Sequence, residues 1–240
     1  MPNGFTGEFL GTAILILLGN GSVANVLLTK SKGHASGWIV ITAGWGFAVM
    51  CGILVALSAG SAGHLNPVVT LAFYAAGNFP AAQILPYISA QLCGAILGSV
   101  LVYLAYLPHW QKTLNAEDKL AAFCTSPAIP NLPANIITEV IATFVLVIVV
   151  IALGSQAVIS TNMATPLIVG LLVWSLGISL GGPTGYAINP ARDLGPRIAH
   201  ALLPIAGKGS SQWSYAFVPV LAPLLGGLIA VGVAKSSGMI

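Results

Sequence analysis

The most evident shortage in this sequence is of charge. Only 5% of its 240 residues are Asp, Glu, Lys or Arg, whereas 57% are hydrophobic. Soluble domains carry about 25% charged residues, so this composition excludes one and indicates an integral membrane protein. At about 20 apolar residues per crossing, the chain has room for six spans and no appended soluble domain.

Cysteine and paired reactive groups are scarce as well. Cys51, Cys93 and Cys124 share no metal-ligand spacing, and a thiol in an apolar run behaves as a small hydrophobe. The net charge is only +3 and its lysines are scattered, which argues against nucleic-acid binding. No nucleophile with a base, phosphate loop or metal cluster is recognisable. We therefore expect no enzyme, no cofactor and no metal, and a lipid bilayer as the partner that composition requires.

Apolar runs predict six spanning helices, near residues 5–28, 37–58, 84–107, 134–155, 164–181 and 213–234. Two further apolar stretches, Leu65 to Ala76 and Ile188 to Leu203, are too short to cross. Each opens with an Asn-Pro dipeptide, at Asn66 and Asn189. Asn is a strong helix N-cap and Pro is favoured at the first helical position. Each stretch therefore predicts a half-helix, a short helix that enters the membrane without crossing it.

The two halves of the chain repeat one another. Glu8 and Thr12 recur as Glu139 and Thr143, and the two Asn-Pro dipeptides lie 123 positions apart (189 minus 66). Three spans per half is an odd number, so the second half enters the membrane from the opposite side, as an inverted repeat with its site at the midplane. We predict one all-α integral membrane domain, with repeat one at about 1–107, a linker at about 108–133 and repeat two at about 134–240.

The half-helices predict the chemistry of the midplane. Each presents unpaired N–H groups and about half a positive charge at its N-terminus, so two such ends meeting there repel cations. If the carbonyls of Asn66 and Asn189 cap their helices, their amide NH₂ groups remain free to donate to a water or a hydroxyl. Donors in this position orient the permeating molecule and disfavour a proton wire.

Two longer motifs carry a family resemblance. They are His64-Leu65-Asn66-Pro67-Val68-Val69-Thr70 and Gly185-Tyr186-Ala187-Ile188-Asn189-Pro190-Ala191-Arg192-Asp193-Leu194-Gly195-Pro196. With them the chain resembles the aquaporin family (major intrinsic proteins) and, more closely, its glycerol-conducting branch. The resemblance implies six transmembrane helices with two re-entrant half-helices, a homotetramer with one pore per subunit, and a multi-pass plasma-membrane protein with cytoplasmic termini. The positive-inside rule favours the reverse orientation, because five of the loop lysines would then lie inside.

The resemblance also implies a selectivity filter of Trp45, Gly177, Tyr186 and Arg192. Water-selective members have His where Gly177 stands, so Gly177 is expected to widen the opening. Trp45 and Tyr186 would supply an apolar corner opposite Arg192, a geometry suited to glycerol. An arginine at this depth is too costly to face lipid, whereas Arg197 is expected to extend toward the headgroups.

Further roles follow from the same resemblance. Glu8 and Glu139 are expected to accept hydrogen bonds from the loops before the half-helices, and Asp193 to brace a nearby loop. The expected pore-lining backbone carbonyls are those of Ala62, Gly63, His64, Pro183, Thr184 and Gly185; the ring of His64 is an alternative contact for the solute.

Two departures from the family pattern bear on selectivity. The stretch from Trp45 to Asn66 is one residue longer than usual, in the loop near Ser58 to Ala62. Val68 stands where the family has Ala, and two additional methyls between the half-helices are able to shift the constriction. Selectivity is therefore expected to differ from that of a typical glycerol channel.

The expected function is a passive channel for small neutral solutes. Glycerol is the first candidate, followed by water, other short polyols, urea and protonated hydroxy acids such as lactic acid. A proton-coupled secondary transporter is the alternative from another class, because intramembrane carboxylates such as Glu8 and Glu139 can carry protons. A non-conducting structural protein and a strictly water-selective channel are further alternatives, and Gly177 disfavours the latter.

Overall fold

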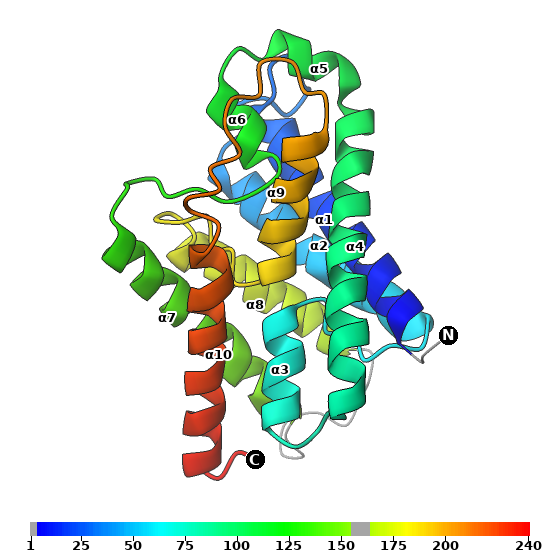
Figure 1. The fold of residues 1–240 in the computed structure, drawn as a ribbon, viewed down its shortest axis with the longest axis vertical. Coiled ribbons are helices and arrows are strands. Elements are labelled where there is room, and N and C mark those ends of the chain that lie inside the picture. The colour runs from blue at the N-terminus through cyan, green and yellow to red at the C-terminus, as the bar shows by residue number, and fades with distance from the viewer. Residues whose placement is uncertain (1–3, 155–163) are drawn as a thin grey trace.

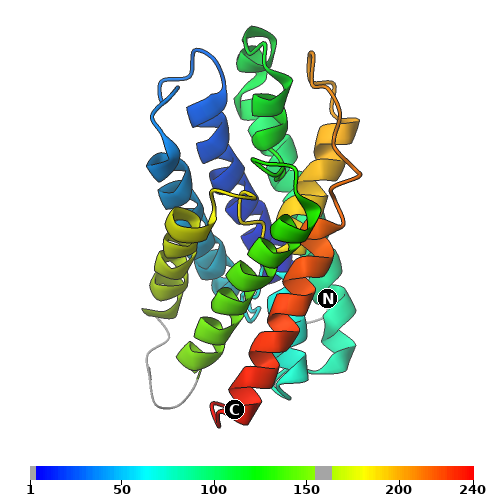
Figure 2. The same cartoon turned by 90° about the vertical axis from the view of Figure 1, so that its left-hand side faces the viewer.

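The computed structural model describes residues 4–154 and 164–240, and all regular secondary structure in these two ranges is helical. Two views show an elongated bundle of helices (Figures 1 and 2). The elements are α1 (Phe5–Leu27), α2 (Trp38–Ser58), α3 (Pro67–Ala75), the 3₁₀ helix η1 (Ala81–Gln83), α4 (Ile84–Ala105), α5 (Leu107–Lys112), α6 (Ala116–Ala121), α7 (Leu132–Gly154), α8 (Ala164–Leu180), α9 (Pro190–Leu202) and α10 (Val218–Ser236).

The predicted spans correspond to six long apolar helices. Helices α1, α2, α7, α10 and the η1–α4 stretch are long and apolar enough to cross a membrane, and α8 is a sixth apolar helix of 17 residues. The largest difference lies in the last span, which starts at Val218 because residues 213–217 form turns closed by backbone bonds such as Tyr215 N to Gln212 O. The all-α fold with six spans is confirmed, and the chain is a multi-pass membrane protein.

Glycines let the spanning helices touch backbone to backbone. Helix α1 packs on α2 and α4, α7 packs on α10, and α2 packs on α8 across the two repeats. A Cβ atom added at Gly46 of α2 would lie 2.7 Å from the carbonyl oxygen of Gly170 on α8, and the reverse distance is also 2.7 Å. Such close contact between helices is typical of small residues in membrane interfaces.

The two half-helices lie one above the other in Figure 1, α9 above α3, with their N-termini toward each other. Each packs against the last helix of the other repeat, α3 against α10 and α9 against α4. Their start residues, Pro67 and Pro190, follow the capping residues Asn66 and Asn189. The inverted-repeat arrangement therefore interleaves the halves.

The connecting segments 28–37, 106–131 and 203–217 gather at one end of the molecule, and the start of α1 and the C-terminus lie in its other half (Figures 1 and 2). Two lysines at this end of the molecule bind backbone carbonyls. Lys119 Nζ donates to the carbonyls of Ala206 (2.5 Å) and Gly207 (3.2 Å). Lys208 Nζ donates to three carbonyls at the C-terminus of α9, at 2.7–2.8 Å. These lysines cap backbone that would otherwise lack donors.

Val68, which was expected to affect the constriction, turns away from it. Its side chain is buried in a cluster with residues of α7 and α10. A Cβ atom added at Gly227 of α10 would lie 2.4 Å from Val68 Cγ1. The methyl groups that distinguish Val68 from an alanine are therefore accommodated by a missing side chain on α10.

This size match predicts a compensating pair. Gly227→Ala places a methyl against Val68, and overpacking of this kind costs about 1–3 kcal/mol. We expect the single variant to unfold at a lower temperature in detergent, followed by tryptophan fluorescence, and Val68→Ala to restore most of the loss. The control is Gly232→Ala on the same helix, where no atom of the described residues lies within 4 Å of the added Cβ. If Gly227→Ala costs the same stability with and without the Val68→Ala substitution, the pairing is contradicted.

Candidate permeation site

The two capping asparagines join the repeats at the centre of the molecule. Asn66 Oδ1 accepts from the backbone N–H of Val68 at 2.9 Å, and Asn189 Oδ1 accepts from the N–H of Ala191 and Arg192 at 3.0 and 3.2 Å. Each amide nitrogen donates to a carbonyl of the other repeat. Asn66 Nδ2 donates to Ile188 O at 2.9 Å, and Asn189 Nδ2 donates to Leu65 O at 2.8 Å.

These cross-repeat bonds modify the expectation that both amide groups are free. An amide NH₂ has two donors, and one on each asparagine is used by the opposite loop. One donor per asparagine remains for a solute. The hydrogen bond to the opposite loop fixes the orientation of each amide group and so the direction of its second N–H.

The loops before the half-helices hold unusual backbone conformations at matching positions. Gly63 and Leu65 in the first loop have φ of 69° and 51°, and Tyr186 and Ile188 in the second have φ of 39° and 47°. For residues other than Gly, and for β-branched Ile above all, this left-handed region is strained. Such backbone persists only where the surroundings fix it.

Glu8 supplies that support in the first repeat. Its side chain is fully buried, and its oxygens accept from the backbone N–H of His64 (2.9 Å) and Leu65 (2.7 Å). The hydroxyl of Ser61 (2.6 Å) and the amide of Gln91 (2.7 Å) donate to the same carboxylate. Four donors thus satisfy one carboxylate, as a buried charge requires.

Glu139 repeats the arrangement in the second half. It accepts from the backbone N–H of Ala187 and Ile188, both at 2.9 Å, and from the hydroxyl of Thr184 at 2.7 Å. Each donor lies 123 positions after its counterpart in the first loop, the same offset that separates the Asn-Pro dipeptides. Neither carboxylate is among the residues that line the central cavity.

Replacing either carboxylate should therefore damage the loop. Glu139→Gln turns an acceptor oxygen into a donor that faces other donors, and each buried group left unsatisfied costs about 1–3 kcal/mol. We expect a lower unfolding temperature and reduced solute flux in liposomes. The control is Glu117→Gln, at an exposed position in α6.

A variant with wild-type stability that loses only a flux driven by a pH gradient would contradict this interpretation. That result would instead indicate proton transfer by Glu139.

A cavity of about 580 Å³ runs beside both asparagines. Its lining includes Trp45, Tyr186 and Arg192, and also Asn78 and Phe79. The lining also includes apolar residues of α2, α7 and α8 and residues of the two loops before the half-helices. The lining therefore combines many apolar residues with the polar residues Asn66, Asn189 and Arg192.

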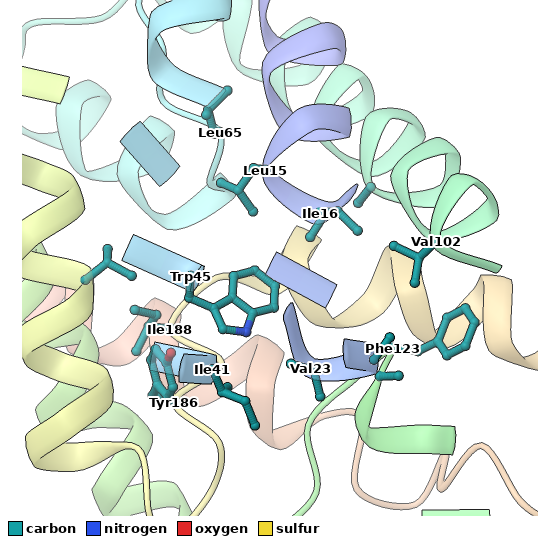
Figure 3. Close-up of a cluster of buried hydrophobic side chains, with 14 of the residues drawn as sticks. Leu15, Ile16, Val23, Ile41, Trp45, Leu65, Val102, Phe123, Tyr186 and Ile188 are labelled. Carbon is teal, nitrogen blue, oxygen red and sulfur yellow. The ribbon is translucent and has the colours of Figure 1, made fainter. Parts of the chain in front are cut away.

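Arg192 lies directly against Trp45. Its guanidinium carbon is 3.8 Å from the centroid of the indole ring, and Nη1 donates to Phe123 O at 3.4 Å. A desolvated contact of this kind contributes about 2 kcal/mol. Figure 3 shows Trp45 in one buried cluster with Tyr186 and Ile188. The indole and the guanidinium are thus stacked, rather than on opposite walls as the resemblance implied.

Gly177 does not line the cavity, because Tyr186 covers it. A Cβ atom at Gly177 would lie 2.7 Å from Tyr186 Oη and 2.9 Å from Thr42 Cγ2. The missing side chain at Gly177 therefore leaves space for the ring of Tyr186. It affects the space for a solute only through the position of that ring.

His64 presents its ring and its backbone to the same region. The ring stacks on Phe73 with centroids 5.1 Å apart and tilts against Phe79 and Tyr87 at 4.8 and 5.2 Å. Its Nδ1 is 3.1 Å from Thr70 Oγ1. Both Ala62 and Gly63 line the cavity beside it. Sequence reasoning missed the contribution of Phe79, which lies in a turn with no motif of its own.

The second loop lines the cavity further along than expected. The lining residues there are Tyr186, Ala187 and Ile188, while the carbonyl of Pro183 accepts from Ala128 N at 2.9 Å. Thr184 is fully buried against Glu139, and Gly185 is also outside the lining set. Adding the 123-residue offset to Ala62, Gly63 and His64 gives positions 185–187. Of these, Tyr186 and Ala187 line the cavity, so the repeat predicts the lining of the second loop better than the expected positions 183–185 do.

Asp193 and Arg197 form a buried ion pair on α9, directly after Arg192, which lines the cavity. Asp193 accepts from Arg197 Nη2 at 2.7 Å and from the N–H and hydroxyl of Thr125 at 2.8 and 2.7 Å. Arg197 also donates to the carbonyls of Thr125, Ser211 and Gln212. The prediction that Arg197 extends to the headgroups is wrong, because its side chain is fully buried. Its guanidinium instead joins two loops to α9.

Removing one partner leaves the other charge buried. Arg197→Met should therefore cost about 3–5 kcal/mol, measured as reduced thermal stability in detergent. Asp193→Asn together with Arg197→Met should lose less than the sum of the single variants, since neither charge is then isolated. The control is Lys235→Met, an exposed residue in the last turn of α10. Additive losses would contradict a coupled pair.

Comparison with known proteins relates the chain to a family. The family described as Major intrinsic protein matches residues 3–233. The chain is 54% identical to a probable glycerol uptake facilitator protein of Thermotoga maritima, over 94% of this chain and 95% of that protein. It is 53% identical to the glycerol uptake facilitator protein of Bacillus subtilis, over 93% and 80%.

Two more distant similarities complete the comparison. A D/L-lactic acid transporter of Lactiplantibacillus plantarum is 40% identical over 96% of this chain and 95% of that protein. The X-ray structure of the aquaglyceroporin from Plasmodium falciparum superimposes with a TM-score of 0.86 at 32% identity, covering 97% of this chain and 94% of that one.

Proposed function

Because the chain belongs to the major intrinsic protein family, we propose that it is a passive membrane channel for small neutral solutes, with glycerol as the principal one. The single observation that carries the proposal is the cavity beside the two facing half-helices, whose polar side is made by Asn66, Asn189 and Arg192. The similarity to glycerol uptake facilitators over nearly the whole chain supports glycerol as the solute.

The proposed filter consists of Trp45, Tyr186 and Arg192, with Gly177 behind the tyrosine ring. Arg192 donates one N–H to Phe123 O and its guanidinium carbon lies over the indole of Trp45, which leaves other guanidinium donors for solute hydroxyls. The ring of Tyr186 provides apolar contact for a carbon chain. A solute with hydroxyls along one edge and carbons along the other fits these two surfaces.

The centre of the proposed pore selects for neutral solutes. Each asparagine has one uncommitted amide donor, and the positive ends of α3 and α9 meet beside it. A cation is repelled there by both dipoles and by Arg192. A hydroxyl or a water can accept from the donors, and the carbonyls of Ala62, Gly63, His64, Tyr186 and Ala187 are the proposed acceptors along its path.

A proton-coupled transporter is the less favoured function. Proton carriers must meet the solute pathway or water. Glu8 and Glu139 are fully buried, are held by four and three donors respectively, and lie outside the cavity lining. Their described contacts support a structural role for both. A strictly water-selective channel is also less favoured, since no side chain at Gly177 narrows the filter.

Several finer features belong to the same proposal. The two repeats are divided by a linker at about 108–133, and the protein resides in the plasma membrane as a homotetramer with cytoplasmic termini. This orientation places Lys119 and Lys208 outside, against the positive-inside rule. Lys119 binds a carbonyl of the 203–217 segment and Lys208 binds carbonyls at the C-terminus of α9, so both have a structural reason to be there. Water, short polyols, urea and protonated lactic acid are proposed as further solutes, the last supported by the lactic acid transporter that is 40% identical.

Stopped-flow light scattering on proteoliposomes tests the function. Under a glycerol gradient we expect shrinkage followed by re-swelling much faster than in protein-free liposomes, because the filter supplies the hydrogen bonds that glycerol loses from water. Re-swelling should not change when a pH gradient is imposed.

Three results would contradict the proposal. Water flux without glycerol flux would indicate a water-selective channel, and uphill accumulation driven by protons would indicate a transporter. A folded protein without any flux would indicate a structural role. Sucrose, which is too large for the filter, serves as the impermeant control.

A further inference from the structure

The ring of Tyr186 lies in a recess at the end of α8. A Cβ atom at Gly177 would be 2.8 Å from Tyr186 Cζ, and one at Gly181, four residues later, would be 2.5 Å from Tyr186 Cδ1. The ring therefore packs against Gly177 and Gly181, where the backbone carries no side chain. Either glycine, if it carried a side chain, would occupy the space of the ring.

Trp38 closes the recess on another side. Its ring meets Tyr186 edge to face, with centroids 6.1 Å apart and an interplanar angle of 77°. The indole Nε1 donates to the carbonyl of Gly177 at 3.0 Å, which fixes the indole to the floor of the recess. An added Cβ at Gly181 would also lie 2.9 Å from Trp38 Cζ2.

We propose that Gly181 and Trp38 are positioning residues that set how far the Tyr186 ring projects into the cavity, and thereby the largest solute that passes. The proposal rests on the channel function proposed above. It assigns specificity to two residues that touch the tyrosine and lie outside the cavity lining.

The backbone of Tyr186 limits how its ring can move in the recess. With φ at 39°, and with the next two amides held by Glu139, the main chain has little freedom to move. A methyl at Gly181 would lie 2.5 Å from both Gly177 O and Tyr186 Cδ1 and 2.9 Å from Trp38 Cζ2, and of these neighbours only Tyr186 lines the cavity, toward which its ring is expected to turn. A change of one methyl behind the ring should thus narrow the opening in front of it.

The test compares two neighbouring glycines. Gly181→Ala fills the recess, whereas Gly182→Ala adds the same methyl where no atom of the described chain lies within 4 Å. In proteoliposomes, we expect Gly181→Ala to lower glycerol permeability by at least about tenfold, the lower end of the effect of one methylene in a fitted pocket, and to leave water permeability nearly unchanged. Gly182→Ala should behave as the wild type.

The background without the ring gives the second arm. When Gly181→Ala is added to a Tyr186→Leu background, it should no longer change the ratio of glycerol to water permeability, because no ring remains to be displaced. An unchanged ratio in Gly181→Ala with an intact Tyr186, or the same fall in both backgrounds, would overturn the proposal. Absence of glycerol flux in the wild type would refute the channel function itself and is thus a distinct failure.

Trp38→Phe keeps the inference testable if Gly181→Ala does not fold. This variant keeps an aromatic ring but is smaller and loses the hydrogen bond to Gly177, so the ring of Tyr186 can withdraw from the cavity and the ratio of glycerol to water permeability should rise. Trp213→Phe, at an exposed position of the 203–217 segment, is the matched control. A ratio that is equal in both tryptophan variants would overturn the proposal.

Discussion

Backbone amides at membrane depth must find hydrogen-bond partners without help from water, and this constraint organises the molecule. The loops before α3 and α9 are irregular, so their N–H groups have no helical acceptors. Glu8 and Glu139 accept from these groups, whose positions in the two loops are 123 residues apart in the chain. These bonds hold residues in the left-handed region, and the carbonyls of Leu65 and Ile188 accept from the asparagine of the opposite repeat.

The same arrangement separates the charges of the site. The negative groups Glu8, Glu139 and Asp193 are fully buried, accept hydrogen bonds from donors around them and lie outside the cavity lining. The positive groups are exposed to it, since Arg192 and the ends of both half-helices border the cavity. The interior is thus polar on one side, apolar on the other and inhospitable to cations, although three buried carboxylates support its walls.

Local signals predicted the fold well. Apolar runs and the Asn-Pro dipeptides indicated the six spans and both half-helices, because each depends on residues adjacent in sequence. The side-chain directions depended on distant partners and were not predictable. Val68 faces α10 because Gly227 leaves space there, and Arg197 is buried because Thr125 and Ser211 bring carbonyls to it. The stacking of Arg192 on Trp45 likewise requires two helices to meet.

The bonds from each asparagine to the other repeat bear on how free energy is used during transport. A carrier that opens alternately to the two sides must let its halves part and rejoin in every cycle. Here such a movement would break both asparagine bonds and separate the bare backbones of Gly46 and Gly170. We infer that the halves stay together while solutes move, so no conformational work accompanies each molecule and the direction of net movement is set by concentration alone.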